Sequence, residues 1–378
     1  MQRKPIRIVH VIARMNVGGP AILISELLKG MNSGEFESKL VTGYCEKNEI
    51  DFIEANSLDL KEKRIAGLGR SISIYGDIKA FYKLTVYLRQ LKPDIVHTHT
   101  AKAGFIGRIA TMLFLPRVKR IHTFHGHLLS GYFSSGKTKI LIFAEKFLAY
   151  FTELIFTVGN QVKMDLLRAG IGKEENMIVS FPGINAESRK DRITTRKEVS
   201  ISDSEVILIF VGRLTKIKRP DRLIEAFRIA SEDINNMTLL VVGDGELRDQ
   251  LERQAFGLKI KFLGWRTDVN DLIAASDISI LTSDNEGMPI TLIESAHLGI
   301  PSISTDVGSV KDVVIHSKTG YLTPLDESVI AERIKQLAIS PSLRLKFGSA
   351  AREHAQLHFS VAAMIKTHAD AYKSVIER

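Results

Sequence analysis

The segment most informative about the fold is residues 283–297, written S-D-N-E-G-M-P-I-T-L-I-E-S-A-H. The segment comes directly after a short apolar run, Asp277–Leu281, that is typical of a buried parallel strand. Gly287 interrupts this pattern, and Pro289 stands where the first turn of a helix tolerates proline. After Pro289 the apolar residues recur at helical spacing. The stretch therefore predicts a strand, a short loop and the start of a helix.

Two glutamates flank this predicted helix start, Glu286 in the loop and Glu294 in the second turn. The first turn of a helix has unpaired N–H groups and the positive end of the helix dipole, which favour a phosphate. Carboxylates on either side accept hydrogen bonds from hydroxyl groups. A phosphate between two sets of hydroxyls describes a nucleotide sugar, with ribose, diphosphate and hexose. The alternative is that Glu286 is a solvated loop residue and Glu294 a surface helix residue.

The stretch E-G-M-P-I-T-L-I-E resembles the Glu-x7-Glu signature of retaining glycosyltransferases of family 4, which have the GT-B fold. That fold is α/β, with two doubly wound Rossmann-like domains facing a cleft. The resemblance implies transfer of a sugar from a nucleotide sugar, with UDP the expected nucleotide, to a saccharide acceptor. It also implies that Glu286 holds the hexose hydroxyls and Glu294 the ribose. Three neighbours join the implied donor site: Gly287, Met288 and Pro289.

The composition is that of an ordinary globular protein. The chain has 378 residues, 44% hydrophobic and 25% charged, which is enough for two domains. Cys45 is the single cysteine, so no intrachain disulfide forms, and a reducing compartment is indicated. No run of eighteen apolar residues occurs, and the N-terminal segment lacks a cleavage site. We expect a cytoplasmic protein and leave open a peripheral contact with the inner face of the cell membrane.

The net charge of +9 is concentrated in the first half of the chain. Residues 1–185 contain 26 Lys and Arg against 16 Asp and Glu, a net of +10, and the remainder nets −1. Residues 95–144 contain seven Lys or Arg and no acidic residue. Such a surface attracts an anion. No nucleic-acid motif accompanies it, so we predict no nucleic-acid partner, and an anionic lipid surface or a pyrophosphate-bearing acceptor explains the charge as well.

Apolar runs alternate with amphipathic segments along both halves of the chain. This rhythm predicts doubly wound parallel sheets, in which ligands bind beyond the carboxyl ends of the strands. The polar segment 186–204 indicates a boundary. We predict an N-terminal acceptor-binding domain of residues 1–185, to which the C-terminal helix 359–378 returns, and a nucleotide-sugar-binding domain of residues 186–358.

Two motifs of the N-terminal half resemble those of the family. N-V-G-G-P contains Gly18 and Gly19, which the resemblance assigns to a glycine loop facing the donor, although a simple tight turn is the alternative. T-F-H-G-H contains His125, which the resemblance places at the donor sugar near the reacting carbon. The alternative is that His125 is simply a packed histidine. A shift of two residues in the alignment of the motif would place His127 in its role instead. The spacing of the histidines near these strand ends matches no standard zinc motif, so we predict no metal site and no cofactor.

The C-terminal half carries further family hallmarks. In G-R-L-T-K-I-K-R-P, Arg213 and Lys218 would neutralise a diphosphate leaving group without a metal, unless they are merely solvated loop cations. The resemblance adds to the donor site Gly243, Asp244, Gly264, Trp265 and Arg266. Trp265 fits packing equally well. Ser309 stands where the family often has a second glycine, which leaves the nucleotide less certain.

Residues 139–156 are apolar almost all round and predict a helix, either buried or forming a lip that contacts a membrane. Phe143, Phe147 and Phe151 form a ridge on it. Positive charge beside an apolar surface suits a lipid diphosphate. The stretch A-K-A-G-F-I-G-R resembles relatives that build bacterial surface polysaccharides on polyprenyl diphosphate. We therefore predict a polyprenyl-diphosphate-linked acceptor, with Lys102 and Arg108 as pyrophosphate contacts, unless these cations only solvate the domain.

Two alternatives from other classes remain open at this point. A GT-B-fold sugar-nucleotide epimerase shares the two-domain shape but needs no acceptor. A non-catalytic sugar-nucleotide-binding protein would need fewer of the charged residues described above.

Overall fold

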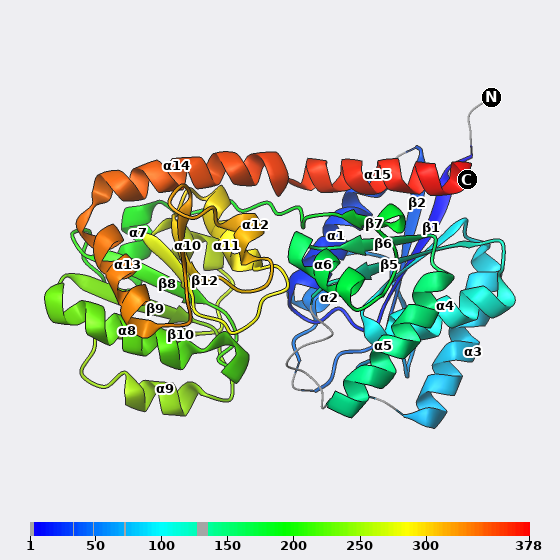
Figure 1. The fold of residues 1–378 in the computed structure, drawn as a ribbon, viewed down its shortest axis with the longest axis horizontal. Coiled ribbons are helices and arrows are strands. Elements are labelled where there is room, and N and C mark those ends of the chain that lie inside the picture. Colours follow the sequence, from blue (N-terminus) through cyan, green and yellow to red (C-terminus); the bar gives the residue numbers. More distant parts are fainter. Residues whose placement is uncertain (1–3, 33, 48, 72, 127–134) are drawn as a thin grey trace. The chain divides into compact units, whose positions relative to one another are not determined.

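The computed structural model describes residues 4–32, 34–47, 49–71, 73–126 and 135–378. The chain divides into two compact units, each a parallel sheet covered by helices (Figure 1). Unit 1 comprises Met1–Gly183 and Val361–Arg378, and unit 2 comprises Ile184–Ser360. The boundaries predicted from the sequence, after residues 185 and 358, differ from these by two residues each.

The sheet of unit 1 has seven strands in the order β3-β2-β1-β4-β5-β6-β7, and the paired strands run parallel. From β1 the chain builds outward through β2 and β3, then returns to β4 on the other side of β1. The strand order therefore reverses between β1 and β4, which is where a doubly wound sheet binds its ligands. The strands are β1 (Ile6–Ile12), β2 (Phe36–Thr42), β3 (Lys63–Arg64), β4 (Ile95–His99), β5 (Lys119–Phe124), β6 (Leu154–Thr157) and β7 (Met177–Val179).

Helices cover both faces of this sheet. Helix α1 packs against α15, while α3 contacts α4 and α4 contacts α5 (Figure 1). Buried leucines of α3, Leu84 and Leu88, pack with Val9 and Val11 of β1 in one apolar core. The helices are α1 (Gly19–Met31), α2 (Phe52–Ala55), α3 (Ile74–Leu91), α4 (Ala101–Phe114), α5 (Ser135–Tyr150), α6 (Asn160–Arg168), a 3₁₀ turn (Glu174–Asn176) and α15 (Val361–Glu377).

The helix predicted over residues 139–156 is wrong at its C-terminal end. Helix α5 ends at Tyr150, and the last apolar residues form strand β6 instead. The backbone N–H of Glu153 donates to the Arg120 carbonyl of β5, which starts the pairing of β6 with β5. A continuous apolar run cannot by itself distinguish a buried helix from a buried strand.

The sheet of unit 2 has six strands in the order β10-β9-β8-β11-β12-β13. Its order reverses between β8 and β11. The strands are β8 (Val206–Val211), β9 (Met237–Val242), β10 (Ile260–Gly264), β11 (Ile278–Leu281), β12 (Ser302–Thr305) and β13 (Gly320–Thr323). The helices are α7 (Arg192–Glu198), a 3₁₀ turn (Lys216–Lys218), α8 (Pro220–Asp233), α9 (Arg248–Gln254), α10 (Val269–Ala274), α11 (Ile290–His297), α12 (Val310–Val313), α13 (Glu327–Ile339) and α14 (Pro341–His358).

The central strands of unit 2 are buried on both faces, which explains why they read as continuous apolar runs. Ile207 and Ile209 of β8 pack with Leu240 of β9 and Leu272 of α10. Within the residues that the structure describes, none of the helices combines the length and apolarity needed to span a bilayer.

Candidate functional site

The two loops at the reversal point of unit 2 carry the residues that the sequence singles out. Strands β8 and β11 are neighbours, so the loops that leave their carboxyl ends emerge side by side. The loop after β8 ends in the 3₁₀ turn that contains Lys218, and the loop after β11 contains Glu286. A backbone hydrogen bond of 2.9 Å, from the Asp284 N–H to the Ile217 carbonyl, joins the two loops. The topology thus brings together residues 68 positions apart.

Lys218 and Glu286 form an ion pair at this point. The Lys218 ammonium lies 2.6 Å from Oε1 of Glu286, and the Ser283 hydroxyl donates to the same oxygen at 2.6 Å. Glu286 is only 7% exposed. A carboxylate this deeply buried is stable as an anion only if it has charged and hydrogen-bonding partners. The sequence predicted Lys218 and Glu286 but missed Ser283, whose hydrogen bond to Glu286 depends on the conformation of the loop after β11.

The backbone of the Glu286 loop is held by the last residue of the neighbouring strand β12 and by a residue of the loop after it. The Ser309 N–H donates to the Glu286 carbonyl at 3.2 Å, and the Thr305 hydroxyl at the end of β12 donates to the Ser283 carbonyl at 2.7 Å. Ser309 is fully buried, and its hydroxyl has no hydrogen-bond partner among the described residues. The residue that departs from the family pattern therefore contacts the predicted hexose-binding loop.

Arg213 is not part of this ion pair. It follows β8, its side chain is exposed, and it makes no ion pair with any residue the structure describes. Its guanidinium stays available to an anion from solution. By contrast Arg219, which follows the 3₁₀ turn, is already paired with Asp221 at 2.9 Å.

Glu294 lies in the second turn of α11 and is partly buried. Burial, which removes water from the carboxyl group, raises its pKa to about 7. Helix α11 begins at Ile290, one residue later than predicted, so Pro289 precedes the helix and does not occupy its first turn. Gly287 and Met288 lie between Glu286 and this helix and are partly exposed.

The remaining donor-site candidates lie in loops after β9 and β10. Gly243 has a φ of +127°, and a Cβ there would lie 2.0 Å from the Gly212 carbonyl oxygen. Close packing of two loops therefore requires this glycine, whatever its ligand. Gly264 also has a positive φ, +66°. The charged candidates are paired locally, Asp244 with Arg248 at 3.2 Å and Arg266 with Asp268 at 2.5 Å.

Trp265 is 48% exposed, which disfavours the alternative that it is a core-packing residue. Its ring is available at the surface of unit 2 beside Gly264 and Arg266. Its contact with a nucleotide base stays a prediction.

In unit 1 the predicted residues follow β1 and β5. Gly18 precedes α1 and Gly19 is its first residue, so the glycine motif leads directly into the helix. His125 follows β5 and is partly exposed, and its Nε2 lies 3.1 Å from Nδ1 of His99. Burial lowers the pKa of His125 to about 3, so its ring is neutral. His127 lies outside the described residues.

The prediction that Arg108 contacts a pyrophosphate is wrong. Arg108 is 1% exposed and pairs with Glu145 of α5 at 2.6 Å. Lys102 pairs with Asp77 of α3 at 2.6 Å. Residues 95–144 contain no acid, but acids outside this segment pair with three of its seven cations in the folded chain, Lys102, Arg108 and Arg120. A charge count along the sequence could not reveal these long-range partners.

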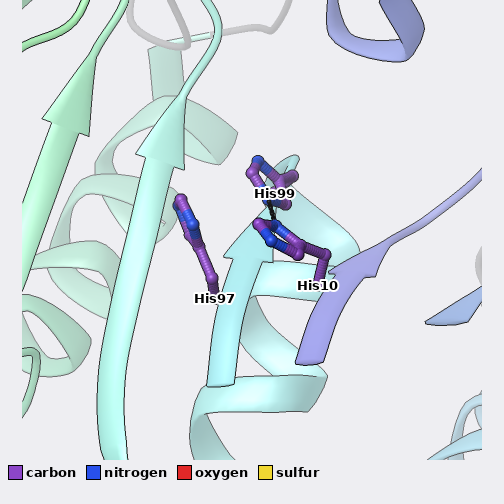
Figure 2. A group of neighbouring side chains, drawn as sticks. All are labelled: His10, His97 and His99. Carbon is purple, nitrogen blue, oxygen red and sulfur yellow. Dashed lines mark hydrogen bonds between the residues drawn. The ribbon is translucent and has the colours of Figure 1, made fainter. Parts of the chain in front are cut away.

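Three buried histidines of unit 1 lie close together, namely His10, His97 and His99, with ligand atoms within 4.8 Å of one another (Figure 2). Both nitrogens of His97 already take part in hydrogen bonds of 2.7 Å, Nδ1 with the Tyr372 hydroxyl and Nε2 with the Thr123 hydroxyl. A metal ligated by His97 would have to break one of these bonds. The absence of a metal site stays a prediction.

Comparisons with known proteins cover both units. Residues 17–188 match the family described as Glycosyltransferase Family 4, and residues 191–354 match Glycosyl transferases group 1. The chain is 31% identical over 285 residues to the UDP-Gal:alpha-D-GlcNAc-diphosphoundecaprenol alpha-1,3-galactosyltransferase of Escherichia coli, which covers 69% of this chain and 70% of that protein. It is 25% identical to the capsular polysaccharide biosynthesis glycosyltransferase CapM of Staphylococcus aureus, over 82% of this chain and 86% of that one.

A solved structure shares the fold along nearly the whole chain. Anabaena Alr3699/HepE in complex with UDP superimposes with a TM-score of 0.81 at 21% identity, covering 98% of this chain and 100% of that one.

The raised pKa of Glu294 predicts a pH-dependent stability of unit 2. The folded state keeps a proton on this carboxyl that the unfolded state releases near its ordinary value of 4.5, so its contribution to stability falls as pH rises from about 4.5 to about 7. Replacing Glu294 by Gln removes this loss. The difference in free energy of unfolding between Glu294→Gln and the wild type should therefore shift by about 2–3 kcal/mol in favour of the variant as the pH rises from 4.5 to 8.

Urea unfolding followed by the fluorescence of Trp265, the single tryptophan, measures this difference in unit 2. Glu332→Gln, at an exposed position of α13, corrects for the loss of a surface charge. A Glu294→Gln difference that is the same at every pH would show that Glu294 does not titrate in this range.

Proposed function

This chain belongs to the family 4 glycosyltransferases, which have the GT-B fold, and from that membership we propose the reaction and the acceptor. It is a glycosyltransferase of polysaccharide biosynthesis. We propose that it transfers a sugar from a UDP-sugar, with retention of anomeric configuration, to a saccharide carried on polyprenyl diphosphate.

The observation that carries this proposal is the Lys218–Glu286 pair at the reversal point of the unit 2 sheet. Doubly wound sheets bind ligands at this position. The Lys218 cation suits the diphosphate of a nucleotide sugar, and the Glu286 carboxylate suits the hydroxyl groups of its sugar. The uridine nucleotide is supported by the UDP bound to the structurally similar HepE and by the UDP-Gal in the name of the E. coli relative.

In the proposed mechanism, positively charged side chains lie where negative charge develops on the leaving group. As the bond between the sugar C1 and the diphosphate oxygen breaks, negative charge grows on the leaving diphosphate. Lys218 and the unpaired Arg213 stabilise that charge, and preorganised cations of this kind contribute most when water is excluded. Glu286 accepts hydrogen bonds from the hexose hydroxyls and Glu294 accepts them from the ribose. A donor diphosphate would draw Lys218 toward it and free the Glu286 carboxylate for the sugar.

Retention follows from attack on the face that the leaving group vacates. The acceptor hydroxyl oxygen bonds to C1 on that face, and its proton passes to the departing phosphate oxygen, so no enzyme base is needed. We propose that no metal takes part, because Lys218 and Arg213 supply the positive charge that a divalent ion would otherwise provide. We further propose that His125 contacts an oxygen of a bound sugar.

The proposed lipid-linked acceptor is supported by the surface of α3, α4 and α5. Large apolar side chains are exposed on all three helices: Ile74, Tyr75, Ile78 and Tyr82 on α3; Phe105, Leu113 and Phe114 on α4; and Ile140, Phe143, Phe147 and Tyr150 on α5. Phe143 is 76% exposed, so the interpretation of this helix as simply buried is wrong. Exposed lysines accompany them, among them Lys79, Lys83, Lys139 and Lys146.

We call the exposed residues named above the α3–α5 surface. Apolar side chains that insert at the level of the headgroups, with lysines beside them, suit an anionic membrane. The name of the E. coli relative includes diphosphoundecaprenol, and a long polyprenyl chain, being apolar, partitions into a bilayer. Contact between this surface and the membrane would bring the enzyme to such an acceptor. The side chain of Lys137, one of the seven Lys and Arg residues in segment 95–144, lies outside the described residues.

The cation roles predict the kinetic effect of two substitutions. Lys218→Ala and Arg213→Ala should each lower kcat for sugar transfer by about a hundredfold or more, because each removes a charge that stabilises the transition state. Lys216→Ala is the matched control, since this exposed lysine belongs to the same turn and has no assigned role. Transfer is measured with UDP-sugars and a lipid-linked acceptor in the presence of EDTA.

Near-wild-type rates for both alanine variants would disprove the proposed charge stabilisation. Loss of wild-type activity in EDTA, restored by magnesium, would disprove the metal-free mechanism.

The α3–α5 surface predicts binding to anionic vesicles. Co-sedimentation with liposomes containing anionic lipid should exceed that with neutral liposomes and weaken with salt. It should fall about tenfold or more in a Lys139→Glu/Lys146→Glu variant, because each cation near such a surface contributes about 1 kcal/mol. Phe143→Ser should also weaken it, while Phe256→Ser, at a phenylalanine of unit 2 that is 89% exposed, should not.

Equal binding to neutral and anionic vesicles would contradict the membrane proposal. So would efficient transfer to small soluble acceptors alone. Neither result would affect the assignment of the donor site in unit 2.

A further inference from the structure

Three neutral histidines form a hydrogen-bonded chain in unit 1 that ends at His125. Nδ1 of His10 lies 3.1 Å from Nε2 of His99, and Nδ1 of His99 lies 3.1 Å from Nε2 of His125. His10 belongs to β1, His99 is the last residue of β4, and His125 follows β5. The chain therefore crosses the point where the strand order of unit 1 reverses. Figure 2 shows the first link, with the His97 ring beside it.

These rings are uncharged. Burial lowers the pKa of His10 to about 3 and holds the pKa of His99 well below its ordinary value. Neighbouring histidines contribute to the lowering of both pKa values. A neutral imidazole has one N–H donor and one bare acceptor nitrogen. Each link of the chain consequently needs a donor on one side and an acceptor on the other. Only two arrangements of protons satisfy both links, and they run in opposite directions.

Nε2 of His10, at the far end of the hydrogen-bonded histidines, decides between the two proton arrangements. Nε2 of His10 is buried and has no hydrogen-bond partner among the described residues. If the protons ran toward His10, this nitrogen would be a buried N–H without an acceptor. If they run away from it, the nitrogen is a bare acceptor. Buried N–H groups without an acceptor are rarer in proteins than buried acceptors without a donor.

A neighbouring histidine shows that this core tolerates a bare nitrogen. Nδ1 of His368 in α15 lies 3.0 Å from the Met364 carbonyl, which can only accept, and 3.2 Å from the Ser180 hydroxyl, which can accept as well as donate. A proton on Nδ1 satisfies both contacts, whereas a bare Nδ1 would leave the shorter one without a donor. Its Nε2 is then a buried nitrogen without a proton, and it too has no partner in the described part of the chain. A bare Nε2 on His10 would therefore be in the same situation as Nε2 of His368, buried and without a hydrogen-bond partner among the described residues.

We propose that His10 and His99 are positioning residues that hold His125 in the tautomer with its proton on Nδ1. In this arrangement His10 donates to His99, His99 donates to Nε2 of His125, and His125 is left with an N–H to donate. His125 then donates a hydrogen bond to an oxygen of a bound sugar and does not act as a proton acceptor. This last step rests on the proposed function, whereas the tautomer itself does not.

The tautomer can be read directly by NMR. In chain labelled with ¹⁵N-histidine, long-range ¹H–¹⁵N correlations distinguish a protonated Nδ1 from a protonated Nε2, and loss of one spin system in His125→Gln assigns it. We expect wild-type His125 to be protonated at Nδ1. A wild-type spectrum with the His125 proton on Nε2 would overturn the proposal, and this readout requires no variant other than the assignment variant His125→Gln.

Substitutions at His99 test the coupling. Leucine can neither donate nor accept, so His99→Leu should release His125 into both tautomers and lower kcat by about tenfold to a hundredfold, as loss of an orienting hydrogen bond does. In His99→Asn the side-chain amide takes the place of Nδ1 and can donate to His125, so the tautomer should return and kcat should rise toward the wild-type value. An unchanged His125 tautomer in His99→Leu would overturn the positioning role.

His122→Leu is the matched control. His122 is also a buried histidine of β5, but it bonds to the Thr98 hydroxyl at 2.8 Å and is not in the chain. Its substitution should leave the His125 tautomer unchanged, and a change there would overturn the proposal. If the spectra agree with expectation while no sugar transfer is found with any donor, the positioning of His125 stands and the proposed function fails. If His99→Leu changes the tautomer but not kcat, the donor role of His125 is wrong.

Discussion

The ion pair between Lys218 and Glu286 is the interaction on which the site in unit 2 depends. A carboxylate that is 7% exposed is unfavourable without a counter-charge, and the loop after β8 supplies one. This requirement fixes the path of both loops at the reversal point of the sheet. The hydrogen bonds from Ser283, Thr305 and Ser309 then hold the loop that leads into α11. The parallel sheet thus determines which side chains meet, and the charge pair determines how they face one another.

Unit 1 shows the same relation between topology and chemistry with different groups. Its strand order reverses between β1 and β4, and there the structure concentrates neutral histidines in place of opposite charges. Thr100, directly after β4, has a φ of +65°, a conformation that non-glycine residues rarely adopt. The Ala13 N–H donates to its hydroxyl, which links the ends of β1 and β4. In each unit the polar groups gather at the reversal point, where the flanking strands leave room for a ligand.

The rhythm of apolar runs in the sequence was sufficient to predict the two parallel sheets. The resemblance to the family singled out Lys218 and Glu286, but not the ion pair that they form with each other. What failed depends on distant partners. The sequence predicted Arg108 to be a free cation, but α5 places Glu145 beside it. It predicted residues 154–156 to be helical, but they belong to β6, which pairs with β5. The His10–His99–His125 hydrogen-bond chain joins β1, β4 and the residue that follows β5, so no single stretch of sequence contains it.

The claim that the two loops of unit 2 bind the donor can be tested directly by hydrogen exchange of the whole chain with and without UDP. The account predicts slower exchange of backbone amides in residues 213–218 and 283–294 when UDP binds, and a smaller effect of GDP at the same concentration. Protection confined to other segments, or a larger effect of GDP, would contradict it.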